Sequence, residues 1–187
     1  MKHIAHMSVP MVGELVNGDR VVVRTEGTDY SLIAVIDGLG HGPGAAAASE
    51  VAAACLVEAS LEMSLLQIME LCHAKMAGTR GAAATVCLAR GRTVEVCAVG
   101  NVELRSAEAR LPLVFSAGLL GVRVRKFHVC QATIPPRARF VLFSDGISSR
   151  TPVDEMRGMS AGAVCDAIMQ KYRRKEDDAT VLVADAE

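Results

Sequence analysis

Two apolar stretches of this sequence each stop abruptly at an Asp-Gly pair. The first is Ser31–Ile36, followed by Asp37-Gly38, and the second is Arg139–Phe143, followed after one serine by Asp145-Gly146. Apolar runs rich in β-branched residues and closed by turn residues are typical of buried strands. The sequence therefore predicts two core strands that each present a carboxylate at the end.

Two further carboxylates come just before predicted strands. Asp19 precedes Val21–Glu26, and Asp177 precedes Thr180–Ala184. In an antiparallel sheet the end of one strand lies beside the start of its neighbour. If these strands are central neighbours, all four carboxylates meet at one edge of the structure.

Clustered carboxylates without a nearby base favour a bound cation. No Lys or Arg lies within two residues of Asp37 or Asp145, and several close carboxylates cannot all stay ionised without positive charge. Oxygen ligands without His or Cys suit Mg²⁺ or Mn²⁺, and the Gly38 carbonyl is a further candidate ligand. The alternative is that each Asp-Gly pair is only a turn.

A glycine-rich segment, residues 40–45, offers a competing interpretation, because Gly40-His-Gly-Pro-Gly-Ala45 fits a dinucleotide-binding fingerprint. Asp37 would place negative charge beside the pyrophosphate, and Pro43 lacks an N–H for a phosphate. No strand ends in an acidic residue about 20 positions later, as that fold requires. These features disfavour dinucleotide binding.

Composition excludes several classes of protein. The 187 residues suggest one domain, 1–187, and 51% hydrophobic with 3% aromatic residues indicates a largely aliphatic core. Twenty basic and twenty-one acidic residues leave no excess charge for nucleic acid. None of the six Cys forms a C-x-x-C pair, and no apolar run is long enough for a signal peptide or a membrane span. We therefore expect no membrane association and a reducing, cytoplasmic location.

The pattern along the chain predicts an α+β protein made of layers, with blocks of strands and helices that do not alternate. The turn at residues 90–92 suggests a hairpin, and Ser64 with Gln67 suggests a capping box. Expected strands are Ile4–Pro10, Val21–Glu26, Ser31–Ile36, Ala82–Ala89, Thr93–Val99, Val102–Ala107, Leu113–Phe115, Val122–Ile134, Arg139–Phe143 and Thr180–Ala184; expected helices are Ala45–Met63, a second from Ser64 to near Gly78, and Ser160–Tyr172.

Five segments, in order along residues 17–181, resemble the motifs of one enzyme family. Residues 35–42, 142–147 and 176–181 resemble motifs of the metal-dependent PP2C-type serine/threonine phosphatases. Residues 17–19 and 118–122 are similar to motifs of its bacterial SpoIIE-like branch. Residues 78–81 and 99–101, with the small size of the chain, look most like the RsbX group of stressosome phosphatases.

The resemblance implies a fold and a metal centre. The fold is a four-layer α/β/β/α sandwich of two antiparallel sheets flanked by helices, with two Mn²⁺ or Mg²⁺ ions at one edge. Carried over by motif, Asp37 bridges both ions and the Gly38 carbonyl binds one. Asp145 and Asp177 are further ligands, Asp19 binds directly or through water, and Asp178 supports the ligands from behind.

The resemblance also implies a reaction and a substrate class. Metal-activated water would hydrolyse phosphoserine or phosphothreonine. His41 is a candidate general acid, the alternative being a residue that only positions the helix start; Arg80, Asn101 and Arg150 are candidate substrate-binding residues, although Arg80 also fits a solvated loop. Expected partners are phosphorylated STAS-domain proteins of the stressosome scaffold or, alternatively, a free anti-anti-sigma factor. The protein itself is expected to be a monomer. A non-catalytic phosphatase-like module is the remaining alternative.

Overall fold

The computed structural model describes residues 1–27 and 29–186. The strands are β1 (His3–Val9), β2 (Asp19–Glu26), β3 (Tyr30–Gly38), β4 (Ala82–Arg90), β5 (Thr93–Val99), β6 (Glu103–Arg105), β7 (Gly118–Leu119), β8 (Arg123–Val124), β9 (Val129–Thr133), β10 (Arg139–Phe143) and β11 (Ala179–Asp185). The helices are α1 (Gly42–Glu58), α2 (Leu65–Lys75) and α3 (Ala161–Tyr172), with a 3-10 turn η1 at Val153–Met156.

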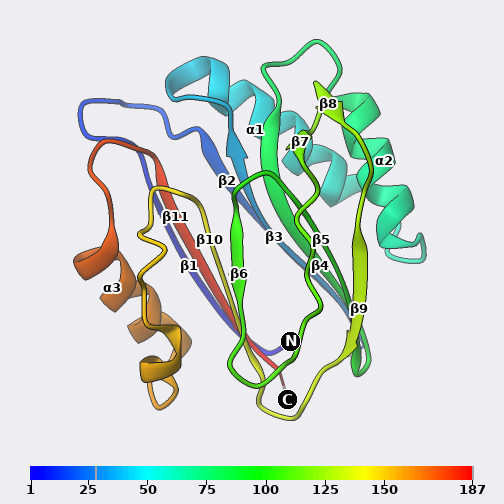
Figure 1. Cartoon of the computed structure of the whole chain (residues 1–187), viewed down its shortest axis with the longest axis vertical. Coiled ribbons are helices and arrows are strands. Elements are labelled where there is room, and N and C mark those ends of the chain that lie inside the picture. The colour runs from blue at the N-terminus through cyan, green and yellow to red at the C-terminus, as the bar shows by residue number, and fades with distance from the viewer. Residues whose placement is uncertain (28, 187) are drawn as a thin grey trace.

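Most of these strands form two antiparallel sheets. One sheet has the order β1-β11-β10-β6 and the other β2-β3-β4-β5-β9, while β7 and β8 form a separate short hairpin. Figure 1 shows the two sheets stacked as adjacent layers, with α3 on the outer face of the first and α1 and α2 on the outer face of the second. Both chain ends lie at the same end of this sandwich (Figure 1).

Three apolar clusters hold the four layers together. One cluster packs α1 and α2 on the β2–β5 side, a second fills the space between the sheets, and a third packs α3 on β10 and β11. Ile33 and Val35 of β3 face the second cluster, whereas Leu32, Ala34 and Ile36 face the first. This alternation along a buried strand follows from the two-residue period of β structure. The four-layer α/β/β/α sandwich is confirmed.

The core is mainly aliphatic, as the composition predicts. Phe140 and Phe143 are the aromatic side chains among the largest fully buried ones, and Met69 and Met76 fill space beneath α2. All six cysteines are free thiols, and all except Cys130 are buried. Flexible Met and small Cys side chains therefore fill gaps that few aromatic residues are present to occupy.

Helix α1 begins earlier and ends earlier than predicted. It spans Gly42–Glu58 instead of Ala45–Met63, because Pro43 is accommodated in the first turn and Ala59 already has extended backbone. The predicted capping box of Ser64 and Gln67 at the start of α2 is present. Among the described residues, no helix has both the length and the apolar character needed to cross a bilayer.

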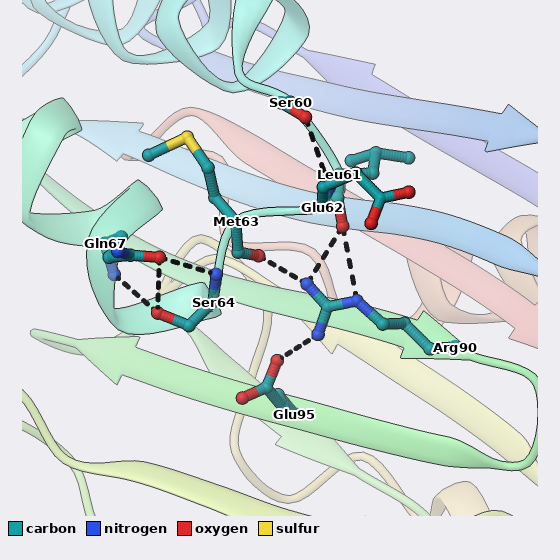
Figure 2. Close-up of polar contacts among 8 residues, drawn as sticks. All are labelled: Ser60, Leu61, Glu62, Met63, Ser64, Gln67, Arg90 and Glu95. Atoms are coloured by element: carbon teal, nitrogen blue, oxygen red, sulfur yellow. Dashed lines mark hydrogen bonds and ion pairs between the residues drawn. The ribbon is translucent and has the colours of Figure 1, made fainter.

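The connection between α1 and α2 is held by Arg90 at the end of β4. Figure 2 shows its guanidinium group between the carbonyls of Leu61 and Met63 and the carboxylate of Glu95. The Nη2–Leu61 O distance is 2.9 Å. Arg90 thus donates hydrogen bonds to carbonyl groups of the α1–α2 connection that accept none within a helix. These bonds hold the connection between the two helices against the sheet.

Two predicted strands are wrong in the β-rich half. Leu113–Phe115 forms no strand, and Val122–Ile134 is split into β8 and β9. The split occurs because β8 turns back to pair with β7 whereas β9 pairs with β5 on the sheet edge. β7 was not expected, since a two-residue strand has no periodic pattern of its own. The hairpin between β4 and β5 is as predicted.

Candidate active site

The first two carboxylates of the sequence pattern face each other across β2 and β3. Asp19 begins β2 and is the direct register partner of Asp37, near the end of β3. Asp19 is 2% exposed, whereas Asp37 is only partly buried. The antiparallel pairing therefore gives one buried and one accessible carboxylate at the same strand end.

The second pair comes from the other sheet. Asp145 follows β10, Asp177 precedes β11, and these two strands pair with Phe143 opposite Val181. The sequence argument assumed neighbouring strands, but only the members of each pair are neighbours. The two pairs come together because the sheets pack face to face with these strand ends aligned, at the end of the sandwich away from the termini (Figure 1).

A cavity of about 270 Å³ lies at this junction. Asp37, Asp145 and Asp177 line it together with Asn101, and the rest of the wall is Leu39, Gly40, Ala83, Gly100 and Leu119. The Asn101 amide donates a 2.6 Å hydrogen bond to Asp145 Oδ2. The cavity therefore presents carboxylate oxygens from both sheets to solvent.

Asp19, the register partner of Asp37, has one carboxylate oxygen that is hydrogen-bonded and one that has no partner among the described residues. Its Oδ2 accepts a 2.7 Å hydrogen bond from the buried Ser144 hydroxyl, which in turn accepts one from the Thr180 N–H. Among the described residues Asp19 Oδ1 has no hydrogen-bond partner. A buried carboxylate oxygen left unpaired is costly, so this atom fits a role as a ligand of a cation or of its water.

The pKa values of three carboxyl groups in the cluster are raised, which indicates that their negative charges lack a positive partner. Burial, and then the neighbouring carboxylates led by Asp19, raise the pKa of Asp37 to about 9. Burial also raises the pKa of Asp19 to about 7, against the lowering effect of the hydrogen bond from Ser144. The pKa of Asp177 is raised by burial and by Asp145. Oxygen-only ligands in such repulsion suit a hard divalent cation.

The carboxylates line the cavity without forming a closed ligand set. Within residues 1–27 and 29–186, no three His, Cys, Asp or Glu side chains already stand at the spacing of metal ligands. Like charges at this range repel one another, and this repulsion opposes closer approach. The residue types and the unpaired Asp19 oxygen fit a divalent cation.

The raised pKa values predict that the metal-free protein loses stability as pH rises. Folded Asp37 keeps its proton up to about pH 9, whereas an unfolded Asp releases it near its ordinary value of 3.8. Since the folded state binds more protons in this window, the free energy of unfolding falls from about pH 4 to pH 9. Thermal melting in chelator should give a lower Tm at pH 8.5 than at pH 6. An Asp37→Asn variant should show a shallower fall, and a wild-type Tm that rises over this range would contradict the prediction.

Asp178 is not part of the cavity wall and holds a loop. It is buried, and its two oxygens accept 2.8 Å hydrogen bonds from the backbone N–H groups of Met11 and Gly18. These groups mark the two ends of the β1–β2 loop. Asp178 therefore fixes this loop, and its support of the metal ligands stays a prediction.

The glycines of the two Asp-Gly pairs are required by packing. A Cβ on Gly38 would lie 2.1 Å from the Ala45 carbonyl oxygen of α1, and one on Gly146 would lie 1.9 Å from the Asp178 carbonyl oxygen. The sequence analysis gave a role only to the Gly38 carbonyl, as a candidate ligand. The structure adds a different reason, because at both positions another backbone segment occupies the space of a side chain.

The remaining predicted residues lie outside the cavity wall. His41 precedes α1 but makes no side-chain cap, and its Nδ1 lies 2.8 Å from Glu14 Oε1 of the β1–β2 loop. The Arg80 guanidinium lies over Gly44 in the first turn of α1. Arg150 is exposed in the loop after β10. Asn101 is thus the one candidate substrate-binding residue that lines the cavity and contacts a carboxylate there.

Sequence reasoning missed Ser144 and Glu14. Ser144 stands between an apolar strand and Asp145, and a hydroxyl at the end of a buried run is a signal for an internal hydrogen bond. Glu14 has no such signal, because its contact with His41 joins two loops that are 27 residues apart.

Several solved structures share this architecture. The chain is 28% identical, with a TM-score of 0.90 and 97% of both chains covered, to a protein from work on the bacterial stressosome as a modular system adapted to control secondary messenger signalling. It is 24% identical to RsbX in complex with magnesium, with a TM-score of 0.85, 100% of this chain and 97% of the other covered. The catalytic domain of the serine/threonine phosphatase PstP with two manganese ions is 17% identical, with a TM-score of 0.70 and 98% of both chains covered.

The sequence itself identifies the family. A comparison with curated proteins finds no match. The family model of stage II sporulation protein E, SpoIIE, matches residues 27–187, which include the motifs around Asp37, Asp145 and Asp177. The chain therefore belongs to the SpoIIE family, and it shares its α/β/β/α sandwich with RsbX and with the serine/threonine phosphatase PstP.

Proposed function

We propose that this protein is a cytoplasmic, metal-dependent phosphatase that removes phosphate from serine or threonine of STAS-domain proteins in a stressosome, and so resets a stress signal. The observation that carries the proposal is the open cavity at which carboxylates from both sheets meet, together with the unpaired Oδ1 oxygen of buried Asp19. The structural similarity to RsbX and to a stressosome-related protein supports the substrate class.

In this proposal the cavity residues hold two Mn²⁺ or Mg²⁺ ions. Asp37, Asp145 and Asp177 supply side-chain ligands, Gly38 supplies its carbonyl, and Asp19 binds directly or through water. When bound, the ions supply Lewis acidity that activates water and neutralises phosphate oxygens.

The chain's own residues position these ligands. Asn101 holds one oxygen of Asp145 through its amide, so the other oxygen is left for a ligand role. Ser144 fixes Asp19 by binding Oδ2, which leaves Oδ1 unpaired. Such partners orient ligand oxygens and affect metal affinity.

His41 is the proposed source of the proton for the leaving serine or threonine oxygen. The carboxylate of Glu14 holds one ring nitrogen at 2.8 Å, which fixes the orientation of the imidazole at the start of α1. The alternative, a role in positioning the helix alone, predicts that His41→Gln leaves the pH profile of kcat unchanged.

The alternatives within the proposal concern the substrate and the activity. A free anti-anti-sigma factor is the second candidate substrate, and assays with both classes of purified phosphoprotein separate them. A non-catalytic binding module is disfavoured because Asp19, Asp37, Asp145 and Asp177 are all present.

Metal removal tests the activity. Hydrolysis of p-nitrophenyl phosphate should be lost in chelator and restored by Mn²⁺ or Mg²⁺, because the ions supply the activated water. Metal binding should also raise the Tm by relieving carboxylate repulsion, which gives a readout independent of turnover. Full activity of the metal-stripped protein would contradict the proposal.

Arg80 and Arg150 test where the protein substrate is held. Both side chains are exposed and lie outside the cavity wall. Replacing both by Ala should lower kcat/KM for a folded phosphoprotein about tenfold, through lost charged contacts, and lower it far less for p-nitrophenyl phosphate. An equal loss of kcat/KM on both substrates would instead place the arginines in the catalytic centre. No loss on either substrate would show that they are solvent-exposed residues without a role in substrate binding.

A further inference from the structure

An apolar groove adjoins the carboxylate cavity on the β7–β8 hairpin. Its volume is about 380 Å³, and its walls are Ala117, Gly118, Leu119, Val122, Arg123 and Arg125. Leu119 also lines the carboxylate cavity. The two hollows therefore adjoin each other at Leu119.

One face of the hairpin is buried and the other is open. Val124 packs against the core under α2, whereas Val122 on the open side is 58% exposed. Leu119 and Arg123 are register partners, so their side chains share a face. Exposed apolar side chains gathered at a hollow mark a surface that binds another molecule.

The cations of this groove have no hydrogen-bond or ion-pair partner within the described part of the chain. Arg123 and Arg125 are exposed, and among the described residues neither side chain makes a hydrogen bond or ion pair. Lys126, the next residue, is exposed and equally unpaired. The carboxylates next door therefore do not neutralise these charges, which remain available to an acidic ligand.

The hairpin is held firmly in place. Leu120 exchanges backbone hydrogen bonds with Ala82 of β4, and the Gly121 N–H donates to His73 Nδ1 of α2 at 3.0 Å. A Cβ on Gly121 would lie 2.6 Å from the Met76 carbonyl oxygen, so the turn sits directly on the end of α2. A groove fixed from both sides loses little freedom when it binds a partner.

We infer that this groove binds the residues beside the phosphorylated serine or threonine of the substrate protein, and that it selects a segment combining apolar and acidic side chains. The inference rests on the proposed phosphatase function. The apolar walls accept an apolar side chain, and Arg123 and Arg125 pair with the carboxylates of the segment. A polypeptide is favoured because the proposed function places a phosphoserine or phosphothreonine of a protein in the adjoining cavity, so the residues next to it in that chain are the ones that can reach the groove.

Three phosphothreonine peptides test the groove. They share one sequence except for the flanking residues, which are Leu with Asp and Glu in the first, Leu with Lys in the second, and Ser with Asp and Glu in the third. The wild-type protein should show kcat/KM about tenfold higher for the first than for the second, the size expected of two exposed ion pairs, and several-fold higher than for the third. Equal values for all three would overturn the inference.

Charge reversal provides the sharper test. The double variant Arg123→Glu/Arg125→Glu should reverse the order of the acidic and basic peptides, because attraction and repulsion exchange places. Arg92→Glu is the matched control, since Arg92 is exposed in the β4–β5 turn at the other end of the sandwich and should retain the wild-type order. An unchanged order in the double variant would overturn the inference.

Two further measurements separate this inference from the proposed function. Wild-type hydrolysis of p-nitrophenyl phosphate reports on the phosphatase activity alone. Fluorescence anisotropy of the same peptides, labelled and without phosphate, reports on the groove alone. If no peptide or p-nitrophenyl phosphate is hydrolysed but the acidic peptide still binds most tightly, the proposed function is overturned and the groove is supported. If hydrolysis occurs but all peptides bind and turn over equally, the proposed function is supported and the role of the groove is overturned.

Discussion

Replacing Asp37 with Asn should lower turnover of p-nitrophenyl phosphate by more than about 100-fold while leaving the protein folded. Residues that merely support metal ligands contribute 10- to 100-fold, and Asp37 is the carboxylate proposed to contact both ions. The fold should survive because Asp37 is destabilised by burial and by Asp19, as its raised pKa shows. Asn removes that repulsion at nearly the same volume.

The measurement combines kinetics with thermal melting in chelator. The Tm of Asp37→Asn without metal should equal or exceed that of the wild type, and added Mn²⁺ should raise it less. Asp166→Asn, at an exposed position on α3, is the control and should leave both Tm and turnover unchanged. A variant that melts far below the wild type in chelator would make Asp37 a structural residue, and full turnover would remove it from the site.

Replacing Gly38 with Ala should destabilise the protein by about 3 kcal/mol, at the upper end of the range for overpacking. The added Cβ would meet the oxygen, the carbonyl carbon and the Cα of Ala45 at 2.1, 2.7 and 3.0 Å. Backbone atoms of a helix cannot rotate away, so either β3 or the first turn of α1 must shift. For a chain of this size the Tm should fall by about 10 °C.

Gly162→Ala in α3 is the matched control for Gly38→Ala. A Cβ at Gly162 meets nothing within 4 Å, and Ala favours helix over Gly. Its Tm should therefore stay the same or rise slightly. If Gly38→Ala also left the Tm unchanged, the close packing of β3 on α1 would be wrong, and with it the placement of Asp37 at the cavity.

The elements that carry the carboxylates could be predicted because their signals are local. Apolar runs that stop at Asp37 and Asp145 define strand ends through residues that are adjacent in sequence. The pairing of Asp19 with Asp37 follows from the short connection between β2 and β3. The capping box at Ser64 is likewise contained within four residues.

Where the pattern was weak, prediction failed. The segment Val122–Ile134 has β-branched residues without a marked break, and the sequence predicted one strand. Its first part instead folds back on β7, and the turn before it is held through Leu120 and Gly121 by Ala82 and His73 from distant parts of the chain. The groove that we assign to substrate recognition therefore has no local signature.

The sequence by itself determined the strand ends, the carboxylates placed on them, the aliphatic core and, through the order of its motifs, the α/β/β/α sandwich. The tertiary structure alone decided that the two carboxylate pairs belong to different sheets, that Asp19 keeps one oxygen unpaired, and that Gly38 and Gly146 give up their side-chain space to backbone. The reason is physical: turns and periodicity arise from interactions between near neighbours, whereas the cavity exists only where two sheets bury their apolar faces against each other. Contacts between residues more than a hundred positions apart, such as Ser144 with Asp19, are fixed by that packing.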